Sequence, residues 1–331
     1  MRVIITGVAG LLGSRMAEWI ILNKPDVRVV GIDDLSGGFR DNVPSGVEFI
    51  QEDLAEAELG SIFKGGVDYL FHFAAYAAEG LSPFIRRYNY RNNVIATANL
   101  INASIEHGVG RFVFTSSMAT YGDGAPPFDE RDELKPIDPY GIAKLACEMD
   151  LRVANEQHGL QYCIIKPHNV YGRGQNIWDR YRNVLGIWMY NILHGKPITI
   201  YGDGKQTRAF SYIDDSLEPL WNSAENPKAA GEIINLGGIE EIEICEAARV
   251  LSDITGGVEI NYLEARHEVK HAWSTWQKSV DILGFQYNTS LEEGVRQMWE
   301  WAKAQPERQR SGWDKYELDR GLYSYWKETR N

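Results

Sequence analysis

The chain has 331 residues, with 34 lysines and arginines against 46 aspartates and glutamates, and a formal net charge of -12. This length is enough to bury a large core, and we expect two lobes that share one sheet. The negative charge argues against nucleic acid or anionic membranes as general partners, although local basic pockets for phosphate remain compatible with it.

The cysteines and the first residues indicate the compartment. Cys147, Cys163 and Cys245 are odd in number, far apart and without CxxC spacing, which favours neither a disulfide framework nor a zinc site. MRVIITG enters a strand pattern at once and leaves no room for a signal peptide, and no apolar run approaches the roughly 18 residues of a membrane span. We therefore expect a cytoplasmic protein without a bound metal and without a membrane partner.

Strand and helix patterns alternate through the first half of the chain. A β-branched run at 2–6 is followed by helical apolar spacing at 11–22, and two further strands end at Asp33 and Asp53. VDYLFHFAA, at 67–75, is almost continuously apolar, as expected for a strand covered on both faces of a parallel sheet. Later helices and strands are expected at 92–107, 111–117, 140–158 and 161–167. This succession predicts an α/β fold with a doubly wound parallel sheet.

The second half is less regular and contains a smaller lobe. Residues 168–183 are rich in Asn, Gly and Arg and are expected to form loops around a ligand. We expect residues 1–166 to form the cofactor domain, with 209–237 returning to it. The substrate-binding lobe then comprises 167–208 and 238–304. The aromatic stretch 305–331 is expected to pack back on the body.

The first turn of the chain carries a glycine pattern. TGVAGLLG places Gly7, Gly10 and Gly13, with Leu11 and Leu12 between the last two, at a strand-to-helix junction. Small residues there let backbone N–H groups and a helix N-terminus approach a pyrophosphate. Turn glycines without a ligand are the alternative, but the position of the motif and an acid about twenty residues later favour a dinucleotide.

Acidic residues end the second and third strands. Asp33 can accept hydrogen bonds from both hydroxyls of a ribose and repel a 2′-phosphate, which favours NAD over NADP. Asp34 can share this role, and either residue can instead be an ordinary turn aspartate. Asp53, with Leu54 after it, is a candidate for contact with the adenine.

The stretch DPYGIAKLACE, residues 138–148, places a tyrosine and a lysine one helical turn apart. Asp138 can cap the free backbone N–H groups and Pro139 suits the first turn, so a helix is predicted to begin there. Tyr140 and Lys144 then share one face of the helix. The spacing alone is compatible with an exposed helix face or with a proton-transfer device.

A pair of serines follows the fifth strand in FTSSMATYG, residues 114–122. Ser116 and Ser117 by themselves are typical turn formers. Together with Tyr140 and Lys144, in that order after a glycine-rich first turn, they form a much more specific pattern.

With these motifs the sequence resembles the extended short-chain dehydrogenase/reductase family, especially its nucleotide-sugar epimerases and dehydratases. The resemblance runs from Met1 to about Ala304 and rests on TGVAGLLG, FHFAAYAAEG, FTSSMATYG, DPYGIAKLACE, KPHNVYG, YGDGKQTRAFSYIDD and RHEVKHAW. It implies a Rossmann-type doubly wound parallel sheet, a smaller mixed α/β lobe that binds substrate, and NAD as the cofactor.

The resemblance also assigns catalytic roles. It implies that Tyr140 is the catalytic acid/base, that Ser117 polarises the sugar oxygen, and that Lys144 binds the nicotinamide ribose. A free phenol titrates near 10, so reaching roughly 7 requires about 4 kcal/mol of stabilisation of its anion. We expect the Lys144 ammonium and the positive nicotinamide ring to supply it. Further implied cofactor contacts are Phe73, Ala74, Ala75, Asn92, Ser116 and Pro167.

A nucleoside diphosphate cradle is implied on the substrate side. The resemblance matches Asn169 and Arg208 to contacts with the diphosphate-sugar, Arg266 to a second arginine, and Asn183 to a backbone or uracil contact; Met118 is expected beside the sugar. Arginine suits phosphate because its planar fork can hold two oxygens. Surface arginine is the alternative for each, and Arg180 and Arg182 can likewise reach a phosphate or an acidic sugar, or stay solvated.

The residues after Ser117 narrow the expected reaction. In the resembling 4,6-dehydratases an Asp-Glu pair follows the catalytic hydroxyl residue, the decarboxylases acting on nucleotide-linked glucuronate carry a glutamate there, and the GDP-mannose 3,5-epimerases carry a cysteine at the position of Ala119. This chain has Met118 and Ala119, so no second acid/base is visible. Chemistry at C4 alone remains, with a transient 4-keto sugar and return of hydride to the opposite face.

The expected function is therefore an NAD-dependent nucleotide-sugar 4-epimerase of the UDP-glucose/UDP-galactose type. The alternatives are 3,5-epimerisation or dehydration of a GDP- or TDP-sugar, and a non-catalytic NAD(H)-binding sensor on the same fold. The resemblance implies a homodimer formed through the helices at 92–107 and 140–158.

Overall fold

A seven-stranded parallel sheet forms the centre of the computed structural model, which describes residues 1–310, 313 and 315–327. In spatial order its strands are β11 (Ile233–Leu236), β6 (Tyr162–Pro167), β5 (Arg111–Thr115), β4 (Tyr69–His72), β1 (Arg2–Thr6), β2 (Arg28–Asp33) and β3 (Glu48–Gln51). The chain crosses from one side of β1 to the other between β3 and β4, so the strand order reverses beside β1. A doubly wound sheet binds its ligand at such a reversal, outside the carboxyl ends of the strands.

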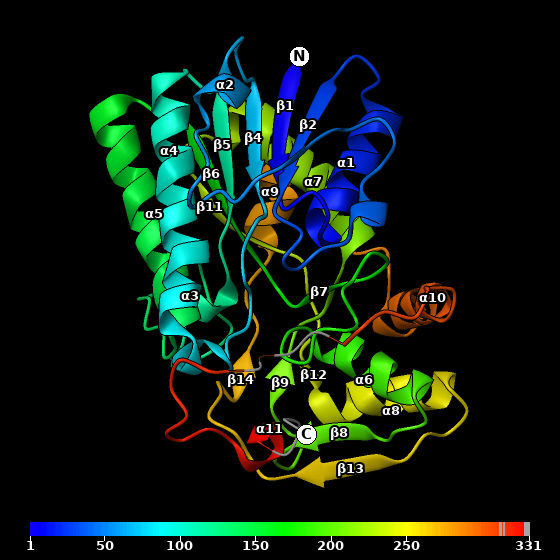
Figure 1. Cartoon of the computed structure of the whole chain (residues 1–331). Coiled ribbons are helices and arrows are strands. Elements are labelled where there is room, and N and C mark those ends of the chain that lie inside the picture. Colours follow the sequence, from blue (N-terminus) through cyan, green and yellow to red (C-terminus); the bar gives the residue numbers. More distant parts are fainter. Residues whose placement is uncertain (311–312, 314, 328–331) are drawn as a thin grey trace.

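Helices cover both faces of this sheet, which explains why its strands are apolar runs rather than alternating ones. One face is covered by α1 (Leu11–Asn23), α7 (Ile213–Glu225) and α9 (Gln277–Leu283). The opposite face is covered by α2 (Gly60–Phe63), α4 (Ala96–Glu106) and α5 (Pro139–His158). Figure 1 shows α4 and α5 side by side along the left edge of the sheet. The predicted Rossmann-type α/β fold is confirmed.

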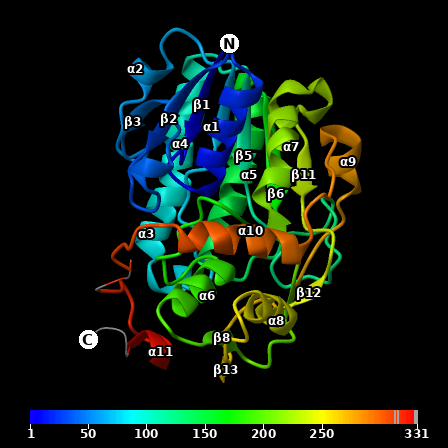
Figure 2. The same ribbon diagram turned by 90° about the vertical axis from the view of Figure 1, so that its right-hand side faces the viewer.

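A smaller lobe lies beyond the carboxyl ends of the strands (Figure 1). Its helices are α6 (Val184–Leu193), α8 (Ile244–Ile254) and α10 (Leu291–Lys303), and they share one apolar cluster. Figure 2 shows α10 lying across the molecule between the two lobes. Its strands are short: β8 (Ile198–Tyr201) with β13 (Ile260–Leu263), β9 (Thr207–Arg208) with β12 (Ile242–Glu243) and β14 (His271–Ala272), and β7 (Val170–Tyr171) with β10 (Ser211–Tyr212).

Two details depart from the sequence-based boundaries. Helix α9 lies within 238–304, yet it packs against α7 and β11 on the main sheet, so we assign 277–283 to the cofactor side. The helix expected at 92–107 begins earlier: α3 (Arg86–Tyr90) leads through a π-helical turn, η3 (Arg91–Ile95), into α4. Its early part contains the polar residues Asn89 and Asn93, which hide the helix in the sequence. Both are buried, and the Asn93 side chain donates a hydrogen bond to that of Asn89.

The described residues also include four short 3-10 helices: η1 (Arg40–Asn42), η2 (Ser82–Phe84), η4 (Met118–Thr120) and η5 (Pro227–Ala229). Among the described helices, none combines the length and the apolar character that crossing a membrane requires.

The described part of the C-terminal stretch packs against the body through aromatic side chains. Trp313, Tyr316 and Trp326 join a cluster with Tyr76 and Tyr181, and α11 (Ser324–Lys327) carries the last of the three. The Glu317 carboxylate accepts hydrogen bonds from the first backbone N–H groups of α3, at 2.8 and 2.9 Å. An acid at a helix N-terminus is favourable for both the free N–H groups and the helix dipole.

Candidate active site

One cavity of about 420 Å³ lies between the sheet and the smaller lobe. It runs from the glycine-rich turn after β1 to the short strands of the smaller lobe. Every site residue expected from the sequence lines it: Gly7, Gly10, Leu11, Leu12, Gly13, Asp33, Asp34, Asp53, Leu54, Phe73, Ala74, Ala75, Asn92, Ser116, Ser117, Met118, Tyr140, Lys144, Pro167, Asn169, Asn183, Arg208 and Arg266. The fold therefore collects these residues from the whole chain, while the role of each remains a prediction.

The glycine-rich turn has the close packing that a dinucleotide cradle needs. A Cβ atom on Gly13 would lie 2.1 Å from the Gly7 carbonyl oxygen, and one on Gly7 would lie 2.7 Å from the Ala74 nitrogen. Gly7 also has a backbone φ angle of +70°, a conformation that glycine adopts more easily than other residues. Gly10 caps α1 in an extended conformation, so the N-terminus of α1 opens on the cavity. These residues fit a pyrophosphate held by backbone N–H groups.

Asp33 is the acid held most firmly at this end. Its carboxylate accepts from the backbone N–H groups of Ala9, at 2.9 Å, and Leu35, at 2.8 Å. Burial raises the pKa of Asp33, although these two hydrogen bonds lower it. Asp34 instead accepts from the backbone and the hydroxyl of Ser36, and Asp53 pairs with Arg91 at 2.6 Å. Asp33 is thus the carboxylate that the fold ties directly to the glycine-rich turn.

The predicted catalytic residues meet near the middle of the cavity. Tyr140 stands at the start of α5, where Asp138 accepts from the backbone N–H groups of Tyr140 and Gly141 as the predicted cap, at 2.9 and 3.0 Å. The Lys144 amine donates to the Thr115 carbonyl at 2.8 Å and lies 5.9 Å from the centre of the Tyr140 ring. The strand end after β5 and the first turns of α5 therefore share one wall.

The two serines differ in orientation. The Ser117 hydroxyl lies in the cavity, where it accepts from the backbone N–H of Ala119 at 3.1 Å. The Ser116 hydroxyl instead donates to the buried carboxylate of Glu148. Only Ser117 thus has a hydroxyl placed beside the Tyr140 phenol.

The electrostatics of Tyr140 differ from the sequence-based expectation. Burial, and after it the Glu79 carboxyl, raises the pKa of Tyr140 above its ordinary value, and the Ser117 hydroxyl lowers it. Burial also lowers the pKa of Lys144 to about 8. The expected lowering of the Tyr140 pKa is therefore absent in the protein alone, because desolvation outweighs the nearby groups.

A pair of arginines also lines the cavity, and a Cβ atom on Gly80 would lie 3.8 Å from the Arg266 guanidinium. Arg208 and Arg266 both pair with the Glu268 carboxylate, at 3.2 and 3.1 Å. The Arg266 guanidinium also lies over the Tyr201 ring, 4.8 Å from its centre. Because one carboxylate holds both, the two guanidinium groups stay close together in a form suited to a diphosphate.

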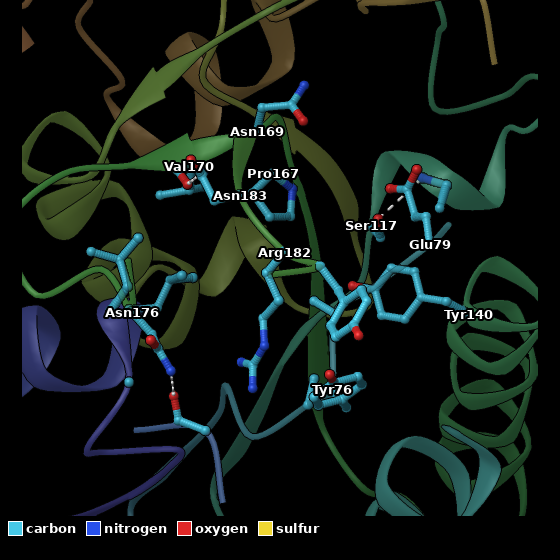
Figure 3. Close-up of a pocket in the computed structure, with 18 of the residues that line it drawn as sticks. Tyr76, Glu79, Ser117, Tyr140, Pro167, Asn169, Val170, Asn176, Arg182 and Asn183 are labelled. Carbon is cyan, nitrogen blue, oxygen red and sulfur yellow. Dashed lines mark hydrogen bonds between the residues drawn. The ribbon is translucent and has the colours of Figure 1, made fainter. Parts of the chain in front are cut away.

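Asn169 and Asn183 line the cavity and hydrogen-bond to neighbouring loop backbones. The Asn169 side chain donates to the Ala209 carbonyl at 3.2 Å, and the Asn183 side chain donates to the Val170 carbonyl at 2.9 Å. The Asn183 side-chain oxygen also caps α6, because it accepts from the backbone N–H of Gly186 at 3.2 Å. Figure 3 shows both asparagines on the side of the pocket opposite Tyr140.

Two cavity residues were missed or left undecided by the sequence. Glu79, which follows the apolar run of the fourth strand, lines the cavity together with Tyr140. Arg182 lies in the centre of Figure 3, paired with Asp179 at 2.8 Å and stacked over Tyr76 at 4.6 Å. An acid in the loop after a central strand, at the carboxyl edge of the sheet, is the signal that could have identified Glu79.

Residues 3–237 match the family model of the NAD dependent epimerase/dehydratase family. The chain belongs to this family. A Bacillus subtilis protein named as an uncharacterised UDP-glucose epimerase is 30% identical over 308 residues, covering 89% of this chain and 96% of the relative.

Solved structures show the same fold. The UDP-glucose 4-epimerase of Thermotoga maritima, solved with UDP-glucose, has a TM-score of 0.86 and 30% identity, covering 92% of this chain and 99% of its own. The UDP-glucuronic acid 4-epimerase of Bacillus cereus, solved with UDP-glucuronic acid and NAD, has a TM-score of 0.84 and 28% identity over the same shares. This epimerase/dehydratase family member is therefore an NAD-dependent nucleotide-sugar epimerase.

Proposed function

We propose that the protein is a 4-epimerase of UDP-hexoses that interconverts UDP-glucose and UDP-galactose through a transient 4-keto sugar. The observation that carries the proposal is the single cavity that joins the glycine-rich turn, the set of Ser117, Tyr140 and Lys144, and the arginine pair. The solved relatives support a UDP-sugar, because their complexes include UDP-glucose, UDP-glucuronic acid and UDP-N-acetylmuramic acid.

The residues divide the work along the cavity. When bound, NAD⁺ supplies the hydride acceptor for the sugar carbon. Tyr140 takes the proton of the sugar 4-hydroxyl and later returns it, while the Ser117 hydroxyl hydrogen-bonds the same oxygen. The Lys144 ammonium holds a ribose hydroxyl and adds positive charge beside the phenol. Arg208 and Arg266 hold the diphosphate, which leaves the sugar to reach Tyr140 and Ser117.

The test is product analysis by NMR. The purified protein is incubated with UDP-glucose, UDP-glucuronate, UDP-N-acetylglucosamine, a GDP-sugar and a TDP-sugar. UDP-glucose is expected to yield UDP-galactose until the two sugars reach equilibrium. Stable loss of water, or inversion only at C3 or C5, would reject the 4-epimerase proposal.

A second candidate is 3,5-epimerisation, and the Glu79 carboxyl is the observation that favours it. Proton abstraction at C3 or C5, next to a 4-keto group, needs a base besides Tyr140. Turnover in D₂O separates the two reactions, because abstraction at C3 or C5 exchanges that hydrogen with solvent. Epimerisation at C4 alone leaves every carbon-bound hydrogen of the sugar unexchanged.

The quaternary arrangement that we propose is a homodimer formed through α4 and α5. Support comes from a row of exposed apolar side chains along one face of α5, formed by Ile142, Ala146, Met149 and Val153. Their spacing of three to four residues gives a continuous stripe on a helix surface. Such a stripe is stabilised when a second helix pair covers it.

A further inference from the structure

Glu79 stands in the cavity at the end where Tyr140 and Ser117 lie. Figure 3 draws the three residues together at the right-hand end of the pocket. The Glu79 side chain stays accessible to the solvent of the cavity, although it is surrounded closely enough that burial raises its pKa. It lies outside the residues directly after Ser117, Met118 and Ala119, which offer no second acid.

The backbone of Glu79 is tied to the start of α5. The Ser82 hydroxyl donates to the Glu79 carbonyl at 2.8 Å and lies 3.3 Å from the Asp138 carboxylate. The Tyr140 backbone N–H donates to the same hydroxyl at 3.2 Å. One serine therefore connects Glu79 with the turn that carries the Tyr140 phenol, which fixes the two residues relative to each other.

The Glu79 carboxylate has hydrogen-bonding capacity that the protein leaves unused. Among the described residues no side chain donates a hydrogen bond to it, although the Arg208 and Arg266 guanidinium groups and the Asp138 and Glu268 carboxyls act on it electrostatically. The neighbouring acids differ, because Asp138 caps α5 and Glu268 holds Arg208 and Arg266. An acid in a polar cavity without a protein partner is satisfied by solvent or by a ligand that donates hydrogen bonds.

The chemistry of a carboxylate restricts which sugar suits it. Hydroxyl groups donate to it in charge-assisted hydrogen bonds, which are stronger than those between neutral groups. A uronic acid would add a carboxylate beside the Glu79 and Asp138 carboxyls, whose like charge disfavours it, while the Arg208 and Arg266 guanidinium groups act in the opposite sense. Glu79 would therefore favour a neutral sugar rich in hydroxyl groups.

We infer that Glu79 is a sugar-binding residue that accepts hydrogen bonds from the hydroxyl groups of a neutral hexose and selects against uronic acids. The inference rests on the proposed function and makes it more specific, since it names the substrate class of the same site.

The test compares wild type with Glu79→Gln in binding and in turnover. Dissociation constants of UDP, UDP-glucose and UDP-glucuronate are measured by calorimetry, and kcat/KM is measured for the two sugars. Wild type is expected to prefer UDP-glucose over UDP-glucuronate by about 100-fold or more, and Glu79→Gln to narrow this preference at least about tenfold. The affinity for UDP should stay within about twofold, because UDP lacks the sugar.

Two further variants keep the result interpretable. Glu133→Gln removes an exposed acid outside the cavity and should change neither preference nor affinity. Glu79→Asp keeps the negative charge and should still exclude UDP-glucuronate while binding UDP-glucose more weakly. If Glu79→Gln also loses affinity for UDP, its sugar preference no longer reports on Glu79 alone, and the preference of Glu79→Asp is used instead. Binding of UDP-glucuronate by Glu79→Asp as tight as that of UDP-glucose would overturn the inference.

Failure of this inference differs from failure of the proposed function. A wild-type protein that epimerises UDP-glucose, with the preference unchanged within twofold in Glu79→Gln, contradicts the role of Glu79 alone. A protein that inverts no sugar at C4, yet loses its binding preference in Glu79→Gln, contradicts the proposed reaction alone. Deuterium incorporation at C3 or C5 that disappears in Glu79→Gln would make Glu79 a base and overturn its binding role.

Discussion

Tyr140 shows how strongly the site depends on its ligands. In the protein alone, burial keeps the phenol protonated by raising its pKa, and Glu79 adds to this effect. The Lys144 amine meanwhile donates to the Thr115 carbonyl. A positively charged ring beside the phenol would oppose both effects, so we expect the phenol to lose its proton more easily in the complex with oxidised NAD than in the free protein.

Replacement of Tyr140 by phenylalanine tests the acid/base role. We expect Tyr140→Phe to lower kcat at least about 100-fold, because general acid/base groups contribute that much or more. Binding of NAD and of UDP, measured by calorimetry, should remain close to wild type since the ring is kept. Retention of full activity would show that another group moves the proton.

The low pKa of Lys144 predicts a pH dependence of stability. Burial lowers its pKa from 10.5 to about 8, so between these values the unfolded chain binds more protons than the folded one. The contribution of Lys144 to the free energy of unfolding therefore rises by about 3 kcal/mol between pH 8 and pH 10.5. The cost of the buried charge is present below pH 8 and vanishes above about 10.5.

Urea unfolding of the cofactor-free protein and of Lys144→Met, at a series of pH values, measures this contribution. The free energy of unfolding of wild type minus that of the variant should increase as the pH rises from 7 to 10.5. A difference that stays constant with pH would mean that the folded protein binds the lysine proton as tightly as the unfolded chain does.

At the scale of elements, the segment after β7 reaches across the cavity to the loop after β2. The Asn176 side chain donates to the Gly37 carbonyl at 3.0 Å, and a Cβ atom on Gly37 would lie 2.2 Å from the Arg182 guanidinium. Gly38, next in this loop, packs on the backbone of Ala9 in the glycine-rich turn. The two lobes thus meet above the turn where we expect the pyrophosphate.

Arg182 should therefore strengthen cofactor binding. We expect Arg182→Gln to weaken NAD binding about tenfold or more, because a charge-assisted hydrogen bond to a phosphate is lost. Arg131→Gln, which removes an exposed arginine paired with Asp129, is the matched control. Fluorescence titration of NAD measures both variants, and equal affinities would place Arg182 outside the cofactor contacts.

The elements differ in how far their sequences predict them. The central strands β1, β4, β5 and β6 are largely apolar runs, and Asp138 and Pro139 mark the start of α5, so both are predictable from local chemistry. The start of the helix at Arg86 is not, because its buried Asn89 and Asn93 look solvated until their partners are known. Polar residues inside a core depend on hydrogen bonds that tertiary structure supplies.

The candidate site divides in the same way. The glycine-rich turn and the Tyr140–Lys144 pair depend on spacing within one segment, so the sequence predicts them. The position of Glu79 depends on Ser82 and on α5, which begins more than fifty residues later. No local pattern encodes such a contact, and this is why a second acid was not expected.

At the scale of the whole molecule, the apolar face of α5 predicts the oligomeric state. Ile142, Met149 and Val153 are 44%, 58% and 45% exposed, which is unusual for large apolar side chains on one helix face. We expect Met149→Glu to convert a dimer into a monomer, because the charge would be buried in the interface. Light scattering after size-exclusion chromatography measures the mass of each form.

Leu22→Glu is the matched control for this change. Leu22 is 73% exposed on α1, away from α4 and α5, so its replacement should leave the mass unchanged. A wild-type protein that elutes as a monomer at micromolar concentration would contradict the proposed dimer.

The central claim is that the hydrogen on C4 of the sugar leaves and returns within one closed site. UDP-glucose carrying deuterium at C4 tests it directly, with NMR of the product after incubation with the wild-type protein. We predict UDP-galactose that retains the deuterium at C4. Formation of UDP-galactose with hydrogen from water at C4, or no inversion at C4 at all, would contradict the claim.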